Sequence, residues 1–440
     1  MKHHVGELIR RKRKELGLTL QDIAGPTLSV PTISNIERGI TRNVSQKKLD
    51  YILHKLGINL AELLDVEQEE SELEDFFTVK LNQVNALILN NCFDEADERL
   101  KALEQEVKKM SNAVHTCRLS LYRGKLFMYE KKFDRAEWEF HNVIRRCEEF
   151  DVPSDSNLVS EAYGNLGYIA YHQGNYNNAI KHTNKALHTF EATGERRYLK
   201  GRQLYNLALF YESMGKANKA YGLTSQALAI AKENGDYSSM INVYILKSII
   251  QQNYFNINDA LESLKEAQKF LHLTNDPKLT GIVWNNLGEN YFLLGNYDMA
   301  ELCFETSVAI KQKHLEDEFL IRSYMFLGQI CAKRGNYSQA KTYLHEAIAL
   351  SKKAGNQKYL VESLLSLTKV YLTCKETDNA KDVLETAYSF AKRHSFTKEL
   401  REATVWLAQL YEKSDKEKFR KYTDELYTIE KESLLEGGIV

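Results

Sequence analysis

The stretch LGNYDMA at residues 294–300 returns with changes as RGNYSQA at 334–340, and an earlier relative, QGNYNNA, occupies 173–179. In each copy an alanine stands three residues after the tyrosine. Alanines at this place in the pattern recur in steps of 40 to 43 residues. They are Ala96, Ala136, Ala179, Ala220, Ala260, Ala300, Ala340 and Ala380. A fixed period of this length indicates a repeat architecture that covers most of the chain.

A second small residue stands twelve positions before most of these alanines, as at Gly124, Gly167 and Gly288. Small residues allow two helices to approach closely, and neighbouring Leu and Tyr fill the gaps beside them. We expect Gly-Asn-Tyr to end the first helix of each unit: Gly adopts the left-handed turn, Asn tolerates it, and Tyr begins the packing of the second helix. Each unit is then a helical hairpin that buries its apolar face only by stacking on its neighbours.

The segment WNNLGENYFLLGNYDMAELCFETSVAI, which starts at Trp284, resembles a tetratricopeptide repeat. Its period is near 40 residues instead of the usual length of about 34, a lengthening typical of bacterial peptide-receptor versions. Nine hairpins cover residues 76–430, and the last has Arg420 in place of alanine, which suggests a terminal cap. We therefore predict an all-α protein in which these hairpins form a right-handed superhelix. The alternative, generic helical hairpins, predicts almost the same shape.

The composition agrees with a helical, globular chain: 43% of the 440 residues are hydrophobic, 27% are charged, and only four are prolines. No apolar run approaches the roughly 20 residues that span a bilayer, and the N-terminal segment becomes charged too soon for a signal peptide. These features predict a cytoplasmic protein with no membrane partner.

Charged residues are distributed unevenly along the chain. Residues 1–64 contain 11 Lys/Arg and 6 Asp/Glu, a balance of +5, whereas the remainder carries −6, which together give the net charge of −1. Between them lies the acidic stretch 65–75, DVEQEESELED, which is either a solvated linker or the start of a polar connecting helix. We predict a separate basic head at 1–64, repeats at 76–430 and a C-terminal tail at 431–440. A basic head on an acidic body is typical of a nucleic-acid-binding module attached to a sensing domain.

Reactive side chains form no pattern of their own. The six cysteines show no close pair and no zinc-ligand spacing, so we expect reduced helix residues. No catalytic triad, Gly-rich phosphate loop or metal cluster is present, which predicts a protein that is not an enzyme and uses no cofactor or metal.

The head can be divided into five short helices. The first, near 6–16, places Val5, Leu8, Ile9 and Leu16 inward. Thr19 is a suitable N-cap for the second helix, and Ser29 caps a third in which a first-turn proline is tolerated. Ile33, Ile36 and Leu49 are predicted to lie in the core.

This pattern resembles the xenobiotic-response-element class of helix-turn-helix domains, through Arg13, the segment LTLQDIA at 18–24 and TISNIERG at 32–39. The resemblance implies that Glu37 pairs with Arg13 as a structural brace. The turn between Ala24 and Ile33 is one residue shorter than the commonest form, as in some peptide-regulated members, which affects how Val30 and Pro31 are presented.

The third helix is expected to enter the major groove of double-stranded DNA. Thr32, Ser34 and Asn35 would read base edges, and Gln21, Arg38 and Asn43 would contact phosphates. The set of candidate DNA-binding residues is Gln21, Val30, Pro31, Thr32, Ser34, Asn35, Arg38 and Asn43. Alternatively, the domain serves only in protein–protein contacts.

The first helix of each hairpin lines the inner face of such an array, with one stripe at roughly i, i+4, i+7 spacing. Asparagine recurs at one level of that stripe, and an amide side chain both donates to and accepts from an extended peptide backbone. The candidate peptide-binding residues are Arg118, Asn165, Tyr168, Arg202, Asn206, Asn242, Asn286, Glu289, Arg322 and Gln329. Alternatively, the asparagines only satisfy neighbouring helices or water.

The order of these modules resembles the RRNPP family of peptide-pheromone receptors, and the lengths are most similar to its NprR-like and then its PlcR-like members. The resemblance implies a homodimer, or alternatively a tetramer, that controls transcription in quorum sensing. A short re-imported oligopeptide would bind the concave groove and change the affinity of the two heads for DNA. Two alternatives stay open. The array could bind a response-regulator protein as Rap-like relatives do, inhibiting or dephosphorylating it, or the chain could be a phage lysis–lysogeny regulator.

Overall fold

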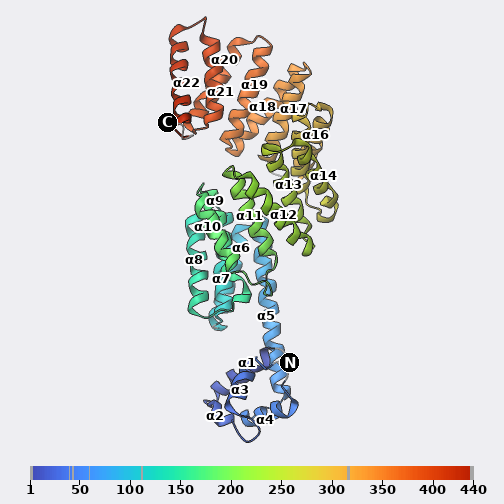
Figure 1. Ribbon diagram of the computed structural model, residues 1–440, viewed down its shortest axis with the longest axis vertical. Helices are drawn as coiled ribbons and strands as arrows, with labels where there is room; N and C mark the ends of the chain where they lie inside the picture. Colours follow the sequence, from blue (N-terminus) through green and yellow to red (C-terminus); the bar gives the residue numbers. More distant parts are fainter. Residues whose placement is uncertain are drawn as a thin grey trace. The chain divides into compact units, whose positions relative to one another are not determined.

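The structure, a computed structural model, describes residues 3–38, 40–41, 44–58, 60–110, 112–314 and 318–436. Across these residues the regular elements are helices, with no strand (Figure 1). Two compact units are present, residues 1–154 and 155–440.

Unit 1 contains eight of the helices of the described chain. They are α1 His3–Glu15, α2 Leu20–Ile23, α3 Val30–Glu37, α4 Gln46–Leu56, α5 Leu60–Leu89, α6 Phe93–Met110, α7 Ala113–Tyr129 and α8 Phe133–Glu149.

Unit 2 contains the remaining α-helices, preceded by the short 3-10 helix η1 Ser154–Ser156. They are α9 Leu158–His172, α10 Tyr176–His188, α11 Tyr198–Ser213, α12 Ala217–Glu233, α13 Tyr237–Tyr254, α14 Ile257–Thr274, α15 Pro277–Leu293, α16 Tyr297–His314, α17 Glu318–Lys333, α18 Tyr337–Ala354, α19 Gln357–Thr373, α20 Thr377–Arg393, α21 Thr397–Tyr411 and α22 Lys416–Glu436.

The repeat prediction is confirmed. Helices α5 to α22 form nine consecutive pairs, and in unit 2 each helix packs on the next one (Figure 1). All eight alanines of the forty-residue ladder are fully buried. A Cβ added at Gly288 would lie 2.9 Å from the ring of Phe304, so the close approach of α15 and α16 requires the missing side chain.

The Gly-Asn-Tyr turns follow the prediction in two residues and depart from it in one. Gly295 has φ +76°, and Tyr297 begins α16. Asparagine does not share the left-handed turn: Asn175 is the N-cap of α10, and its side chain accepts from Asn178 N. The side-chain oxygen bonds an amide that the helix leaves without a partner.

The head has its own core, built from α1–α4. Its buried residues are Ile9, Ile23, Leu28, Ile33, Ile36, Leu49, Ile52, Leu53 and Leu56. The prediction for Leu16 was wrong, because this side chain is 48% exposed. Helix α1 ends at Glu15, the chain turns at Gly17 with φ +69°, and Leu18 packs against the core instead.

The fifth helix of the head is not a short separate element. It is the beginning of α5, a continuous 30-residue helix that includes the acidic stretch 65–75. Its second half packs Phe77, Leu81, Val84 and Ile88 against α6 and α7. Of the two interpretations of the acidic stretch, the structure therefore has the connecting helix. The boundary between domains near residue 65 stays a prediction.

Candidate functional site

A buried ion pair fixes the third helix of the head against the first. Arg13 donates from Nε to Glu37 Oε1 at 2.8 Å and from Nη2 to Glu37 Oε2 at 2.9 Å. Its third nitrogen, Nη1, donates to the Leu18 carbonyl at 2.8 Å. The hydrogen bond to Glu37 raises the pKa of Arg13 above its ordinary value. These are the two residues that the family resemblance paired, and their bidentate geometry fixes the orientation of α3 on α1.

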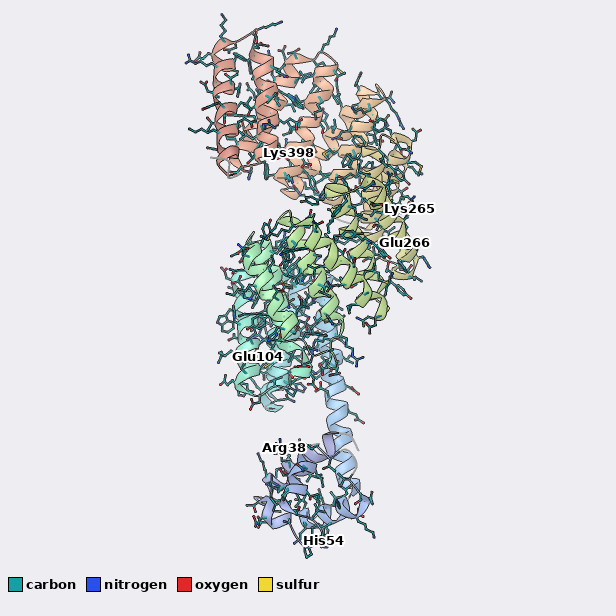
Figure 2. All side chains as sticks on the ribbon, in the orientation of Figure 1. Arg38, His54, Glu104, Lys265, Glu266 and Lys398 are labelled. Atoms are coloured by element: carbon teal, nitrogen blue, oxygen red, sulfur yellow. The ribbon has the colours of Figure 1, made fainter. Side chains whose placement is uncertain are left out.

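The predicted DNA-reading residues Thr32, Ser34 and Asn35 alternate along α3 with the buried residues Ile33 and Ile36. Figure 2 draws the side chains of the head and labels Arg38. Pro31, Asn35 and Arg38 are exposed, as is Gln21 on α2, whereas Val30, Thr32 and Ser34 are half-buried. Asn43 lies outside the described residues.

The two caps that precede these helices work differently. Thr19 and Asp22 form a capping box at the start of α2, and the bonds from Thr19 lower the pKa of Asp22. Ser29 occupies the N-cap of α3 as predicted, but makes no side-chain bond to the helix backbone. Its hydroxyl instead lies 2.9 Å from the Thr32 hydroxyl. Thr32, a candidate base-reading residue, is therefore already in a local hydrogen bond.

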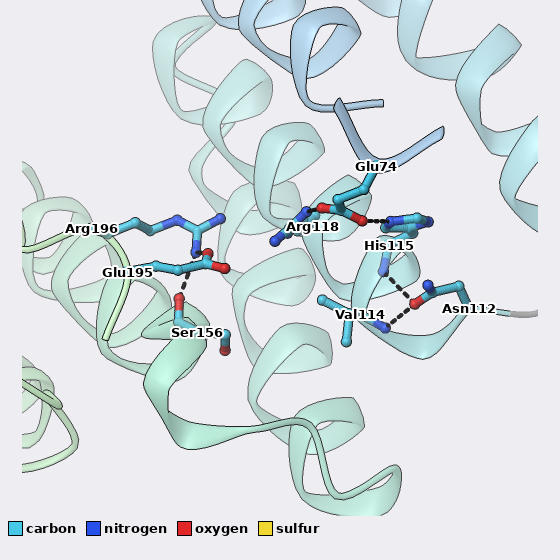
Figure 3. Close-up of polar contacts among 8 residues, drawn as sticks. All are labelled: Glu74, Asn112, Val114, His115, Arg118, Ser156, Glu195 and Arg196. Atoms are coloured by element: carbon cyan, nitrogen blue, oxygen red, sulfur yellow. Dashed lines mark hydrogen bonds and ion pairs between the residues drawn. The ribbon is translucent and has the colours of Figure 1, made fainter. Parts of the chain in front are cut away.

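In unit 1 the candidate peptide contact Arg118 lies against the connecting helix. Figure 3 shows Glu74 of α5 between Arg118 and His115 of α7. His115 Nε2 lies 2.6 Å from Glu74 Oε2, and the His115 ring packs on Phe77 with centroids 4.0 Å apart. The bond from His115, and then the bond and charge of Arg118, lower the pKa of Glu74 to about 2. This Glu74 clamp joins α7 to the helix that continues into the head.

A second charged cluster lies at the start of α9 in unit 2. Glu161 is fully buried, with Arg196 Nε 3.2 Å from its Oε2 and Arg202 Nη2 3.6 Å from its Oε1. Arg196 also donates to Ser156 O at 2.5 Å and to Glu195 at 2.7 Å, contacts that Figure 3 draws. Arg202 is thus the more loosely held of the two arginines.

Several polar atoms around this cluster are buried without a hydrogen bond. They include Asn165 Nδ2, Arg202 Nη2 and both amide atoms of Gln203, a residue with no exposed surface. Asn165 itself is 5% exposed, and Tyr168, one turn further along α9, is 37% exposed. The structure thus places Asn165, Tyr168, Arg202 and the buried Asn206 on the neighbouring helices α9 and α11. We call the group Glu161, Asn165, Arg202, Gln203 and Asn206 the α9–α11 polar cluster.

The other candidate peptide residues of unit 2 have partners within the protein. Glu289 pairs with Arg322 and accepts from Gln252 Nε2 at 3.1 Å. Asn286 donates to the Ile282 carbonyl at 2.8 Å, Asn242 donates to Ser238 O at 3.0 Å, and Gln329 donates to Ser366 Oγ at 2.9 Å. Asn242 and Asn286 each bond to the preceding turn of their own helix, and their role in peptide binding stays a prediction.

Three features were missed at the sequence level. Arg196 lies in a loop, so it is not part of the i, i+4, i+7 stripe of a first helix. Gln203 is on such a helix but follows the stripe residue Arg202 by one position, so it was not included. The signal that could have found Gln203 is Gly164, where an added Cβ would lie 2.0 Å from the Gln203 amide. The third is a surface cavity of about 470 Å³ in unit 1, lined by charged residues of both signs from α6, α7 and α8, among them Asp97, Lys101 and Arg135.

Among the described residues, no helix combines the length and apolar character needed to cross a membrane. The same part of the chain holds no group of three or more His, Cys, Asp or Glu residues placed to bind one metal ion.

Comparisons with known proteins agree with the two modules. A helix-turn-helix family model matches residues 9–63, and a tetratricopeptide-repeat model matches 282–314. A model described as anaphase-promoting complex subunit 5 matches 166–254 and 324–414.

Among individual proteins, the transcriptional activator NprA of Geobacillus stearothermophilus is 23% identical over 313 residues, which are 69% of this chain and 73% of the relative. The apo form of the quorum sensor NprR from B. thuringiensis has a TM-score of 0.61 at 17% identity, covering 81% of this chain and 99% of that one. NprR in complex with its cognate peptide NprX has a TM-score of 0.51 at 16% identity, covering 80% and 99%. These likenesses show the fold.

Proposed function

We propose that this chain, an RRNPP-type regulator with a helix-turn-helix and tetratricopeptide repeats, binds duplex DNA through α3 and a short oligopeptide through the inner faces of its repeats. It acts in the cytoplasm as a homodimer. Peptide binding changes its affinity for a two-half-site operator, because the peptide favours one arrangement of the repeats over another.

The observation that carries the peptide part is the set of unsatisfied polar atoms in the α9–α11 polar cluster. Leaving a buried donor without an acceptor costs about 1–3 kcal/mol. The amide of Asn165 and the guanidinium of Arg202 are two such donors on adjacent first helices. The carbonyl oxygens of an extended peptide are acceptors of the right chemistry for them. NprR, a solved protein of this fold, was determined in complex with its cognate peptide NprX, which supports peptide binding as the function of the repeats.

The Glu74 clamp supports a route from repeats to head. Because α5 runs unbroken from Leu60 to Leu89, a displacement of α7 acts on the helix that also packs on α1. Ligand binding that shifts α7 would thereby alter the presentation of α3. The coupling free energy equals the difference in peptide affinity between the two arrangements.

The peptide part is tested by searching the adjacent reading frames for a small propeptide that carries a secretory signal, and by calorimetry with synthetic C-terminal fragments of it. Asn165→Ala and Asn206→Ala should each weaken binding by about tenfold, the equivalent of roughly 1.4 kcal/mol. Asn218→Ala, an exposed asparagine on α12, is the matched control and should bind normally. Equal affinity in all three variants and the wild type would refute the assignment of this site.

The DNA part is tested by selecting genomic fragments with the full-length protein and measuring binding to them by fluorescence anisotropy. A variant carrying Thr32→Ala, Ser34→Ala and Asn35→Ala should lose at least tenfold in specific affinity, since each base contact contributes about 1–3 kcal/mol. Arg420→Ala, on an exposed part of α22, is the charge-changing control. Unchanged selectivity in the triple variant would overturn the role of α3.

Response-regulator binding stays a prediction, which a phosphate-release assay checks.

A further inference from the structure

The cavity of about 470 Å³ in unit 1 lies at the joint between two neighbouring hairpins. One wall is a single face of α6, formed by positions 94, 97, 101 and 104, and the other wall is the second half of α7 together with the start of α8. Sites for small molecules commonly have volumes of about 300–1,000 Å³. None of the described candidate residues for DNA or peptide binding lines this cavity, so its lining has no part in the proposed function.

A later joint of the same kind, between α16 and α17, is closed by an arginine. Arg334, which directly follows α17, donates from Nη2 to Asp298 Oδ1 and from Nη1 to Glu301 Oε2, each at 2.5 Å. Both carboxylates belong to the beginning of α16. The flat guanidinium group, with its donors in a fixed fork, is well suited to join two carboxylates. This arginine thereby connects one hairpin to the next.

The joint that holds the cavity has the two carboxylates but lacks the arginine. Asp94 and Asp97 stand two positions before and one position after the ladder alanine, as the two acids of α16 do. Glu130 takes the place of Arg334, six positions after the small glycine of the preceding helix. A carboxylate cannot join two other carboxylates, because like charges repel. We call Asp94, Asp97 and Glu130, which all line the cavity, the carboxylate mouth.

The carboxylate mouth is only loosely neutralised. Lys101 Nζ lies 2.6 Å from Asp97 Oδ2, and Lys132 Nζ lies 2.7 Å from Glu130 Oε1. The two lysine side chains are 68% and 48% exposed, and ion pairs of such exposed groups are weak. Within the described chain, the Asp94 side chain takes part in no hydrogen bond or ion pair. A cation with several donors therefore has acceptors available at this place.

The same cavity also offers a positive group and an apolar surface. Arg135, in the first turn of α8, lies over the Phe127 ring with its guanidinium carbon 5.8 Å from the centroid. Among the described residues it forms no ion pair. The other arginine of the lining, Arg123, is already used, because its Nη2 donates to Glu104 Oε2 at 2.9 Å (Figure 2 labels Glu104). Arg135 is thus the arginine that is available to a carboxylate.

We propose that this cavity binds a small molecule that carries both a guanidinium and a carboxylate group, of which free arginine is the simplest example. The guanidinium bridges Asp94 and Asp97, as that of Arg334 bridges the corresponding acids of α16. The methylene chain of the ligand lies on Phe127, and its carboxylate pairs with Arg135. The ligand supplies from solution the group that closes the later joint from within the chain. This inference does not rest on DNA or peptide binding.

The test is isothermal titration calorimetry of the full-length protein with L-arginine as the probe. Citrulline has nearly the same shape but a neutral ureido group, and it should bind about tenfold more weakly or worse, because the charge-assisted hydrogen bonds are lost. Agmatine keeps the guanidinium and lacks the carboxylate, so it should also bind more weakly than arginine. Equal affinity for either analogue would overturn the proposed ligand class.

Two variants separate the two ends of the site. Asp94→Asn should weaken both arginine and agmatine by about tenfold, since it removes a charged acceptor of the guanidinium. Arg135→Gln should weaken arginine to the affinity of agmatine and leave agmatine itself unchanged. Asp134→Asn, an exposed aspartate beside Arg135 that does not line the cavity, is the matched control and should bind arginine normally.

Glu130→Arg copies the closed joint of α16 and α17. It should abolish arginine binding and raise the melting temperature, because the new side chain reaches the same carboxylates from within the chain. Circular dichroism checks that each variant is folded. The proposal is overturned if the wild type does not bind arginine at millimolar concentration. It is equally overturned if the folded Asp94→Asn and Glu130→Arg variants bind arginine as the wild type does.

Discussion

Two buried arginine–carboxylate contacts, one in the head and one in the repeats, differ in how completely their atoms are bonded. In the head, all three nitrogens of Arg13 donate, and both Glu37 oxygens accept one of these bonds. In the repeats, Arg202 stands 3.6 Å from a fully buried Glu161, beyond hydrogen-bond distance, and its Nη2 has no hydrogen-bond partner. A closed network holds a structure in one arrangement, whereas buried donors left open are suited to a ligand.

The largest expected effect comes from opening the closed network. Glu37→Ala leaves the Arg13 charge buried without its partner, which should destabilise the head by about 3–5 kcal/mol. Hydrogen exchange of the amides in α1–α4 measures this locally. Arg11→Ala is the control, since its side chain and that of Glu15 are half exposed and such pairs contribute roughly 0–1 kcal/mol. If the amides of α1–α4 were equally protected from exchange in the two variants, the Arg13–Glu37 pair would not stabilise the head.

A smaller effect of opposite sign is expected in the α9–α11 polar cluster. Gln203→Met removes two buried amide atoms that have no partner and keeps a similar volume, so it should stabilise unit 2 by about 1–2 kcal/mol. Urea unfolding of the full chain measures the change. Gln339→Met, at an exposed position on α18, is the control. If Gln203→Met destabilised the protein, the Gln203 amide would have to be hydrogen-bonded in solution. The α9–α11 polar cluster would then resemble the fully bonded network of the head.

Removing the loosely held arginine should cost less than breaking the brace. Arg202→Ala leaves Glu161 still paired with Arg196, and the Arg202 side chain is 34% exposed, so the loss should be about 1 kcal/mol or less. The same urea experiment reports it. If Arg202→Ala lowered the free energy of unfolding as much as Glu37→Ala does, Arg202 would be a residue that the fold requires, as Arg13 is.

The smallest effect concerns pH and the Glu74 clamp. The pKa of Glu74 is lowered to about 2 in the folded protein, so its contribution is present above the ordinary value of 4.5 and is lost as the pH falls from there toward 2. The side chain is 44% exposed, and solvent screening reduces this contribution to roughly 0.2–1 kcal/mol. Thermal unfolding of the wild type and of Glu74→Gln should differ at pH 6 and converge near pH 2. A constant difference across that range would contradict the assignment.

Features set within one hairpin could be predicted from the sequence. The buried alanines and the left-handed Gly295 follow from spacing, because a helix pair of fixed length needs a small residue and a turn at fixed places. The N-cap at Thr19 follows from local hydrogen bonding in the same way.

Features that depend on a neighbouring helix could not be predicted. Arg118 meets Glu74 from 44 positions away, and the two residues lie on different helices. The stripe that gave Asn165 and Asn286 the same expected role did not distinguish an amide bonded within its own helix from one without a partner. Spacing indicates which face a side chain occupies. Its partners are set by the packing of elements distant in sequence.

The unbroken course of α5 sets a strict rule for changes in its length. Each residue of an α-helix adds about 1.5 Å and turns the chain by roughly 100°. One residue inserted in the acidic stretch would rotate α1–α4 to a different side of the axis, whereas about seven residues would restore the original azimuth at a greater distance. The strength of any regulation transmitted through this helix should therefore rise and fall periodically with the number of inserted residues. A flexible linker would show no such periodicity.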